Sequence, residues 1–502
     1  MSNVPRNRLG TAVHCVAAAK LLLHLYAGRQ YGYFVDELYY LACSRHLAMG
    51  YVDQPPLIAW LTWAWTSMFG DSLTAIRLLP ALAGAAEVIL TALLARELGG
   101  GRFAQLLAAI AVLVAPGILG TGNLLTMNAF EPLFWLGCAY LTVRIVRTGN
   151  QKLWIWFGIL AGFGLLNKYS MAIFGAGIVF GILLSPHRKC LLGRWIWIGG
   201  GIALFIFHSN LVWNLHHGFP FFELQENIRR SGRDAALGLV TFFGQETLTM
   251  HPLTLPLWLA GLWFYFSKAG KEFRMLGWAW VFTAFVIVVL SPRIYYLFPA
   301  FPLLFAAGGV MLEGVRWLRV AYPALLIATG AVLAPLAIPL LTPTSYVAYS
   351  KALGIGQPKL ENHALGPLPQ IFADQFGWEE MVREVARVYH SLPPEVRSKT
   401  AIFGQNYGQA GAIDLFGPRY GLPPAISGHQ NYFFWGPRDY NGESVIVLDD
   451  RRENLELRFA NVEKVGRVHH PYSMPYQHFD VFYCQGLAQP LKDLWPQLKK
   501  WQ

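Results

Sequence analysis

Charged residues are scarce in this 502-residue sequence. Asp, Glu, Lys and Arg make up 14% of it, whereas a soluble globular protein contains roughly 25%. This shortage excludes an ordinary water-soluble protein of several domains. Hydrophobic residues account for 54% of the chain, and apolar windows of about 20 residues, the length of a bilayer-spanning helix, recur along it. The sequence therefore predicts a polytopic membrane protein.

Several chemical signatures are also missing. The five cysteines show neither metal-binding spacing nor the pattern of a disulfide framework. The sequence contains no GxxxxGK[ST] and no HExxH motif, which excludes a Walker-type phosphate loop and a zinc protease of that class. It also lacks Asp-x-Asp, the metal–diphosphate motif of many nucleotide-sugar transferases. An activated substrate at an outward-facing site is therefore expected to arrive on a lipid.

Hydropathy predicts eleven membrane spans followed by a soluble tail. The N-terminus lacks a small-x-small cleavage site, so its apolar run is interpreted as an uncleaved first helix. The predicted domains are an all-α transmembrane domain, residues 1–342, and an extracytoplasmic α/β domain, residues 343–502, which has a normal size for a soluble domain. The predicted spans are 9–27, 73–94, 103–120, 127–146, 153–167, 169–185, 195–213, 253–267, 276–291, 297–313 and 321–341.

The positive charges indicate the orientation of the membrane domain. With the N-terminus in the cytoplasm, the inner segments hold fifteen Lys and Arg but only three acidic residues, as the positive-inside rule requires. An odd number of spans then places the tail outside. Residues 343–502 contain sixteen basic and sixteen acidic residues, so the net charge of +11 belongs to residues 1–342. This basicity is a topology signal and gives no reason to expect a nucleic-acid partner.

The unusual polar clusters all fall on the outer side of this topology. They are FVDELYY, YVDQPP, GNLLTMNAFE, NKYS, the loop 214–252 and SPRIYYL. Their shared side predicts a single extracytoplasmic site. The acids of the first outer loop, Lys168 and Arg293 are expected to converge on it.

The first outer loop carries adjacent acids at the edge of the membrane. Its sequence predicts two amphipathic surface helices, residues 37–50 and 55–70, with leucines such as Leu47 and with Met49 on the apolar face of the first.

Asp36 and Glu37 begin the first of these helices, and Asp53 precedes the second. Two interpretations remain open. The acids cap the helices, or they form a base or a divalent-cation site in which all three are the candidate metal ligands. A divalent cation is the one cofactor considered.

Ionisable residues near the spans are costly, at about 2.5–3.5 kcal/mol for a charge at the centre of a membrane helix. Glu131 lies in the first turn of the fourth predicted span, Lys168 lies between the fifth and sixth, and Arg293 precedes the tenth. Lys168 and Arg293 suit a lipid phosphate at the outer leaflet. The alternative is that they are interfacial anchors.

The motifs together resemble a known class of enzymes. FVDELYY, the YVDQPPL turn, LLTMNAFEPLFW, GLLNKYS and SPRIYYLFPAFPLL occur in the order, and on the side of the membrane, seen in the GT-C membrane glycosyltransferases. Within that class the chain is similar to the dolichyl-phosphate-mannose-protein mannosyltransferase-like family, whose bacterial members include the lipid A aminoarabinose transferases. The resemblance covers residues 1–342, and NYGQAGAIDLFG and GHQNYFFWGP in the tail also look like the outer domain of bacterial members.

The resemblance implies an inverting sugar transfer from a polyprenyl phosphate and assigns roles to residues. Asp36 matches the catalytic acid, with Glu37 beside it, and Lys168 matches a basic residue near the lipid phosphate. Two departures are Gln54, where the aminoarabinose transferases carry lysine, and Asn128, where relatives often carry aspartate. The donor or acceptor site is expected to include Asp53, Gln54, Asn128, Glu131, Tyr295 and Tyr296, and the phosphate site Lys168, Arg293 and the loop arginines Arg229, Arg230 and Arg233.

The tail is predicted to be an α/β domain. EEMVREVARVYHSL has the periodicity of an amphipathic helix, and TAIFG, SVIVLDD and FDVFYC are typical of strands. NYGQAGAIDLFG is predicted to form a helix between two of these strands. That the tail covers the site or chooses the acceptor is a hypothesis.

The sequence thus predicts a multi-pass protein of the bacterial inner membrane with a periplasmic active site. Its predicted function is transfer of a sugar from a polyprenyl-phosphate donor to a cell-envelope acceptor, such as lipid A, another glycolipid or a glycan. Three alternatives remain open: a protein acceptor, as in O-mannosylation, a transporter or flippase of a lipid-linked substrate, and a catalytically silent scaffold. The lack of a convincing internal repeat argues against a transporter.

Overall fold

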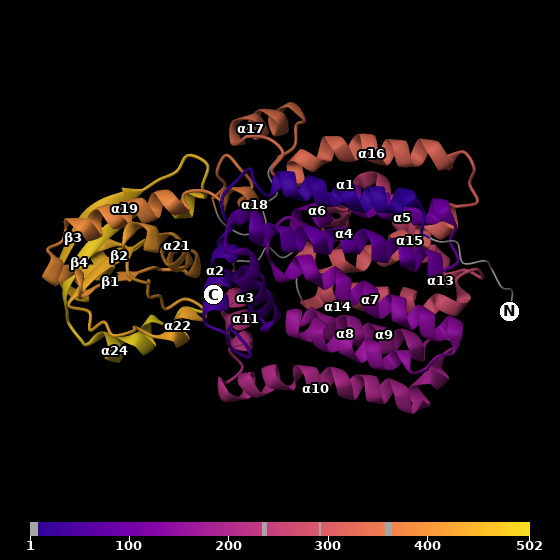
Figure 1. Cartoon of the computed structure of the whole chain (residues 1–502), viewed down its shortest axis with the longest axis horizontal. Helices are drawn as coiled ribbons and strands as arrows, with labels where there is room; N and C mark the ends of the chain where they lie inside the picture. Colours follow the sequence, from indigo (N-terminus) through magenta and orange to yellow (C-terminus); the bar gives the residue numbers. More distant parts are fainter. Residues whose placement is uncertain (1–8, 233–237, 291–292, 357–363) are drawn as a thin grey trace. The chain divides into compact units, whose positions relative to one another are not determined.

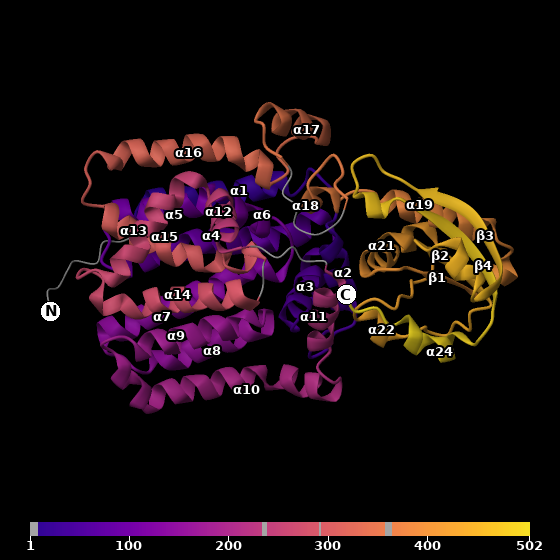
Figure 2. The same cartoon turned by 180° about the vertical axis from the view of Figure 1, so that it is seen from behind.

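A computed structural model describes residues 9–232, 238–290, 293–356 and 364–502. Contacts divide the chain into two compact units. Unit 1 comprises Met1–Gln30, Thr74–Trp213 and Ala236–Leu340, and unit 2 comprises Tyr31–Leu73, Asn214–Ala235 and Leu341–Gln502. Figures 1 and 2 show the elements from opposite sides. The first outer loop therefore belongs to the same unit as the tail. The tail segment of that unit begins at Leu341, next to the predicted boundary at residue 342.

Unit 1 is built from apolar helices. Their buried hydrophobic side chains, among them Leu107, Leu257 and Phe301, form one continuous cluster. Its helices are α1 (Thr11–Ala27), α4 (Leu73–Glu97), α5 (Arg102–Val114), α6 (Pro116–Gly122), α7 (Met127–Thr148), α8 (Leu153–Asn167), α9 (Ser170–Leu183), α10 (Arg194–His216), α12 (Leu239–Thr249), α13 (Leu255–Phe266), α14 (Arg274–Leu290), α15 (Phe301–Leu312) and α16 (Leu318–Ala337).

Helix length tests the predicted membrane spans. Within the described residues, 6 helices are long and apolar enough to cross a bilayer, or up to 7 if the bent pair α5 and α6 is one span. Four shorter apolar helices, Thr11–Ala27, Leu153–Asn167, Ser170–Leu183 and Pro252–Phe266, coincide with further predicted spans. A multi-pass membrane protein is confirmed, and the count of eleven spans stays a prediction.

The bend between α5 and α6 has a local cause. The two helices meet at an angle of 66°. Pro116 begins α6, and Ala115 before it is extended (φ −70°, ψ 111°), because proline disfavours a helical conformation in the preceding residue. One predicted span, 103–120, is therefore two helices.

Glycines allow several helices of unit 1 to pack so closely that their backbones are in contact. A Cβ atom on Gly158 of α8 would lie 2.1 Å from the carbonyl oxygen of Gly199 on α10. A Cβ on Gly308 of α15 would lie 2.0 Å from the carbonyl oxygen of Leu257 on α13. Small residues at such contacts are typical of membrane helices, whose association depends on close packing.

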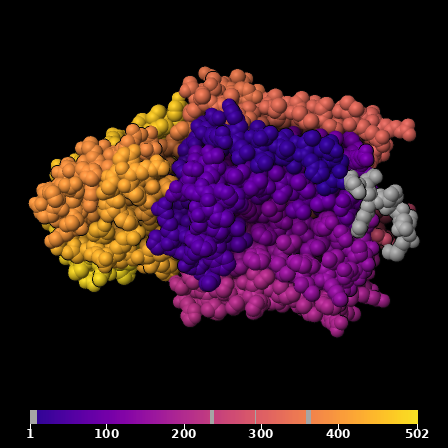
Figure 3. Space-filling model, in the orientation of Figure 1, coloured from indigo at the N-terminus to yellow at the C-terminus, as the bar shows by residue number. Residues whose placement is uncertain are grey.

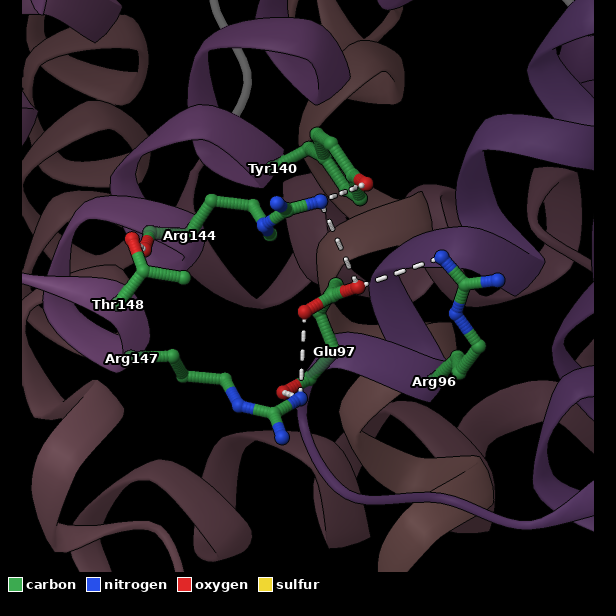
Figure 4. A network of polar contacts seen from close by, with 6 residues as sticks. All are labelled: Arg96, Glu97, Tyr140, Arg144, Arg147 and Thr148. Atoms are coloured by element: carbon green, nitrogen blue, oxygen red, sulfur yellow. Dashed lines mark hydrogen bonds and ion pairs between the residues drawn. The ribbon is translucent and has the colours of Figure 1, made fainter. Parts of the chain in front are cut away.

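A buried carboxylate, Glu97 at the end of α4, lies among three guanidinium groups (Figure 4). Arg147 Nη1 donates to Glu97 Oε2 at 3.2 Å, and Arg96 Nη2 donates to Oε1 at 3.3 Å. Arg144 Nη1 lies 4.0 Å from Oε1 and donates to the Tyr140 hydroxyl at 3.1 Å. One carboxylate thus partly neutralises three basic residues and ties the end of α4 to the end of α7.

The two predicted helices of the first outer loop are present in unit 2, with different ends. They are α2 (Val35–Arg45) and α3 (Leu57–Phe69), which belong to the indigo surface in Figure 3. At His46 the backbone leaves the helical conformation (φ −131°, ψ 65°). Leu47 and Met49, predicted on the apolar face of the first helix, therefore follow it, and both are exposed.

The tail contains a four-stranded sheet of order β1-β2-β4-β3. β1 (Thr400–Phe403) and β2 (Ser444–Leu448) are parallel, whereas β4 (Phe479–Leu487) pairs with both β2 and β3 (Phe459–Val468) in antiparallel fashion. The strands predicted in TAIFG, SVIVLDD and FDVFYC are confirmed as β1, β2 and β4. β3 was not predicted, because it lies at an edge, has half of its residues exposed and carries a register shift before Gly466.

Helices cover the sheet and complete unit 2. One face of the sheet, with Val445 and Val447, packs against Leu491 and Trp495. The predicted helix EEMVREVARVYHSL is confirmed as α19, and NYGQAGAIDLFG as α21. The helices are α11 (Pro220–Ser231), α17 (Pro343–Ala352), α18 (Gln370–Ala373), α19 (Trp378–Ser391), α20 (Pro394–Arg397), α21 (Tyr407–Phe416), α22 (Tyr432–Trp435), α23 (Arg452–Glu456) and α24 (Leu491–Leu494).

The Glu97 cluster predicts a stability effect. Glu97→Gln keeps the shape but leaves three guanidinium groups without their buried carboxylate, so we expect a loss of about 1–3 kcal/mol. The measurement is thermal unfolding in detergent. Glu456→Gln removes an exposed pair with Arg452 and is the control, with an expected effect within about 0.5 kcal/mol. Equal melting temperatures for the two variants would contradict the structural role of Glu97.

Candidate functional site

The adjacent acids at the start of α2 have different partners. Glu37 is fully buried, and its Oε2 accepts a hydrogen bond from the Phe34 backbone N–H at 2.8 Å. This bond satisfies an amide that the first turn of the helix leaves unpaired. Of the two interpretations, helix capping is therefore confirmed for Glu37.

Asp36 is hydrogen-bonded to a residue of the tail. Its Oδ1 accepts a hydrogen bond from the Tyr407 hydroxyl at 2.7 Å. Tyr407 is the first residue of α21, and its ring stacks on Tyr39 at 4.7 Å and on His429 at 5.0 Å between centroids. The Tyr407 backbone N–H also donates to His429 Nδ1 at 3.1 Å. Two stacked rings and a backbone bond thus fix the hydroxyl that holds Asp36.

Asp53 forms the second carboxyl group of this cluster. Its Oδ1 accepts from the Tyr39 hydroxyl at 3.0 Å, and the same hydroxyl accepts from the Asn431 backbone N–H at 3.3 Å. Burial raises the pKa of Asp53 to about 7, and the negative charge of Asp36 adds to this rise. The two carboxyl groups are therefore electrostatically coupled, and Asp53 keeps a proton at a pH where a solvated aspartate has lost it.

Gln54, also predicted in the donor or acceptor site, is fully buried. Its Nε2 lies 4.0 Å from Cys43 Sγ, and its backbone carbonyl accepts from the Tyr51 N–H at 3.0 Å. These contacts place Gln54 inside the loop that leads to α3.

The three predicted metal ligands do not share one centre. Glu37 binds a backbone amide, Asp36 binds Tyr407 and Asp53 binds Tyr39. Over the described ranges, no group of three or more His, Cys, Asp or Glu residues is arranged to hold a metal ion. These residues therefore do not fit a three-carboxylate cation site.

Unit 1 contains a second cluster, around Lys168, in the extended link between α8 and α9. Lys168 Nζ donates to Glu131 Oε2 at 2.7 Å and to Asn128 Oδ1 at 2.8 Å, and both acceptors lie near the start of α7. It also lies 4.4 Å from the ring centroid of Tyr296 and 5.2 Å from that of Tyr295. Four predicted residues from two other segments thus surround the ammonium group of Lys168.

The neighbours of this cluster fix its geometry. Asn167 Nδ2 donates to the Met127 carbonyl at 2.9 Å, and Ser170 donates to the second carboxylate oxygen of Glu131. Arg293 Nη1 lies 3.5 Å from the Tyr295 hydroxyl. The cluster therefore combines a neutralised lysine with a second cation that is also part of the predicted phosphate site.

The loop arginines have another environment. Arg229 and Arg230 lie on α11 in unit 2, pair with Glu226 at 2.6 and 2.7 Å, and have side chains 79% and 75% exposed. Pairs three and four residues apart are ordinary on a helix surface. Arg233 lies outside the described residues.

Sequence reasoning missed Tyr407 and His429. Tyr407 belongs to the NYGQAG motif in the tail, but it follows Asp36 by 371 residues. Both residues lie in tail motifs, NYGQAGAIDLFG and GHQNYFFWGP, that resemble the outer domain of bacterial family members, but the motifs do not identify a partner. Tyr39 was part of the first motif, without an assigned role.

A family model described as "Dolichyl-phosphate-mannose-protein mannosyltransferase" matches residues 53–213. This range contains Asp53, Asn128, Glu131 and Lys168. It ends before Arg293 and begins after Asp36.

Two relatives come from Rhizobium johnstonii (strain DSM 114642 / LMG 32736 / 3841). "Lipid A galacturonosyltransferase RgtD" is 27% identical over 187 residues, which cover 37% of this chain and 39% of the relative. "Lipopolysaccharide core galacturonosyltransferase RgtB" is 26% identical over 185 residues, which cover 36% of this chain and 37% of the relative. The matched stretch thus spans less than half the length of each relative.

The fold is similar to that of a solved structure over almost the whole chain. ArnT from Cupriavidus metallidurans in the apo state has a TM-score of 0.62 and 14% identity, covering 93% of this chain and 97% of ArnT. The same protein bound to undecaprenyl phosphate gives a TM-score of 0.60 at 15% identity with the same coverage. The chain therefore has the fold of ArnT and, as its motifs predicted, resembles the GT-C membrane glycosyltransferases.

Proposed function

We propose that this protein is an inverting glycosyltransferase that moves a sugar from a polyprenyl-phosphate donor to lipid A or the lipopolysaccharide core. The observation that carries the proposal is the Asp36 carboxylate, held by Tyr407 beside Asp53, in a chain with the ArnT fold. The names of both relatives favour a lipopolysaccharide acceptor and a galacturonosyl donor over a protein acceptor. ArnT bound to undecaprenyl phosphate supports a lipid-linked donor.

The charge distribution supports an orientation for this reaction. We place the N-terminus in the cytoplasm and the active site and tail in the periplasm, in the inner membrane of a bacterium, because basic residues concentrate on one side of the predicted spans. The division into a membrane domain, 1–342, and an outer domain, 343–502, belongs to the same proposal. Convergence of the Asp36 and Lys168 clusters on one pocket stays a prediction.

In the proposed mechanism Asp36 is the general base. An acceptor hydroxyl oxygen bonds to the anomeric carbon of the donor while the bond from that carbon to the phosphate oxygen breaks. Asp36 takes the hydroxyl proton, and the polyprenyl phosphate leaves with the bonding electrons from the opposite face, which inverts the anomeric centre. A phosphate is a good leaving group, so one base suffices.

The Lys168 cluster is proposed to bind the donor phosphate. Glu131 already pairs with Lys168, and Arg293, beside Tyr295, is the second basic group proposed to contact the donor phosphate, which is a phosphodiester with one negative charge. Tyr295 and Tyr296 hold the ammonium group against their rings. Asp53 is assigned a supporting role, because its pKa of about 7 leaves it partly protonated at neutral pH.

The first test replaces the base. We expect Asp36→Asn to lower kcat about 100-fold or more, and Tyr407→Phe to lower it about tenfold, because one hydrogen bond to a charged group is lost. Transfer is measured in proteoliposomes from radiolabelled polyprenyl-phosphate galacturonic acid to lipid A.

The matched control for this test is Tyr420→Phe, which removes another tyrosine–carboxylate hydrogen bond of unit 2, at 2.8 Å from Glu379. It should leave transfer unchanged. Full activity of Asp36→Asn at normal expression would rule out Asp36 as the base.

The second test concerns the donor phosphate. Lys168→Met should raise the KM for the polyprenyl-phosphate donor about tenfold, because a charge-assisted hydrogen bond is lost, with a smaller change in kcat. Lys20→Met is the matched control, since Lys20 forms a buried pair with Glu87 at 2.9 Å in the same unit. Both variants should lower thermal stability, but equal donor KM values in the two would remove Lys168 from the phosphate site.

The third test uses the titration of Asp53. In the folded protein its pKa is about 7, against about 3.9 in an unfolded chain. The folded state keeps the proton longer, so stability from this group is complete below pH 4 and is lost as the pH rises through 7.

Asp53→Asn removes this pH-dependent loss of stability, and the asparagine still offers an oxygen that accepts the hydrogen bond from the Tyr39 hydroxyl. We expect its melting temperature, relative to wild type, to rise between pH 5 and pH 8, and Asp493→Asn, at an exposed position of α24, to show no such trend. The same relative melting temperature for Asp53→Asn at both pH values would show that Asp53 does not titrate in this range.

A further inference from the structure

A groove of about 720 Å³ lies between α2 and α3 in unit 2, apart from the carboxyl groups of the cluster around Asp36. Its volume is in the usual range of small-ligand sites. The residues that line it include Ser44, Arg45, Trp63, Thr66, Ser67 and Asp71.

A charged pair lies in this α2–α3 groove, and backbone contacts fix it. Arg45 Nη2 lies 3.1 Å from Asp71 Oδ2, and Arg45 Nη1 donates to the Asp414 carbonyl at 2.8 Å. The Asp71 carbonyl accepts from the Tyr33 hydroxyl at 2.8 Å. The side chains of Arg45 and Asp71 are 44% and 48% exposed. The pair has no net charge, and it offers a ligand both hydrogen-bond donors and acceptors.

Three hydroxyl groups add acceptors to the wall of the groove. Ser44 donates to the Leu41 carbonyl at 2.7 Å, Thr66 to the Thr62 carbonyl at 2.8 Å, and Ser67 to the Trp63 carbonyl at 2.7 Å. Each hydroxyl thus donates its hydrogen bond to a backbone carbonyl of its own helix. The oxygen lone pairs then suit a ligand that is rich in hydroxyl groups.

Apolar side chains surround these polar groups. Trp63 is 51% exposed, and Met68, Phe69, Leu47 and Met49 are all exposed next to the groove in the chain. Exposed tryptophan and large apolar residues on such helices are typical of a membrane interface. A polar groove with an apolar rim fits an amphiphile that has a sugar headgroup and acyl chains.

We propose that the α2–α3 groove binds the sugar headgroup of the glycolipid acceptor, with its acyl chains on the apolar rim. The inference rests on the proposed function and adds a second contact point for the acceptor. Ser44 follows Asp36 by eight residues on the same helix, which is about 12 Å along its axis. The groove therefore holds the end of the sugar headgroup that is remote from the reacting hydroxyl, where binding energy positions the substrate.

The test measures binding and kinetics of lipid A in phosphatidylcholine nanodiscs. Trp63→Ala removes the aromatic wall, and Ser67→Trp fills the groove. We expect each to raise the Kd and KM for lipid A about tenfold, with the donor KM unchanged and kcat within twofold. Trp156→Ala, on α8 and 60% exposed, is the matched control and should change none of these values.

The same experiment distinguishes lipid A from another occupant of the groove, and it tests the groove independently of the proposed function. If phosphatidylglycerol binding is lost in both groove variants while the KM for lipid A stays the same, the groove is a phospholipid site and the inference is wrong. If wild type transfers no sugar to lipid A but binds it, and the variants weaken that binding, the groove stands and the transfer proposal fails. Normal lipid A binding by both variants would overturn the groove alone.

Discussion

The hydrogen bond from Tyr407 to Asp36 is the contact on which the proposed chemistry depends. It joins a helix of the first outer loop to a helix of the tail, and both belong to unit 2. Burial and the charge of Asp36 raise the pKa of Tyr407 well above its usual value, so the phenol stays a donor throughout the physiological pH range. The tail is thus part of the environment of the carboxylate, and its fold sets the orientation of Asp36.

The membrane environment imposes a second constraint, because a charge inside unit 1 needs a partner. Lys20 meets this need with a single carboxylate, Glu87. Lys168 has more contacts than neutralisation requires, since Asn128, two tyrosine rings and Glu131 all converge on its ammonium group. Such convergence of polar groups from separate segments is expected of a binding site and is unnecessary for a structural pair.

Sequence patterns predicted those features that depend on composition over many residues or on local order. Hydropathy located the helices of unit 1 except α12, which lies in the predicted loop 214–252, and strand-like runs located β1, β2 and β4. The residues around Lys168 were predicted one by one, although their mutual contacts were not. The contact of Tyr407 with Asp36 had no local signal, because 371 residues separate the two. Helix capping by Glu37 and the early end of α2 at Arg45 depend on single backbone conformations, which periodicity does not resolve.

The clusters around Lys168 and Asp36 differ in how their charges are compensated. Around Lys168 the ammonium group is already paired with Glu131, so the proposed phosphate site contains no unpaired buried lysine. Around Asp36 the carboxyl groups are held by neutral tyrosines, and mutual repulsion together with burial keeps a proton on Asp53. Asp36 therefore lies near less negative charge than an ionised Asp53 would provide. Since the tail supplies Tyr407, changes in the tail can alter the environment of Asp36 without changing the residues around Lys168.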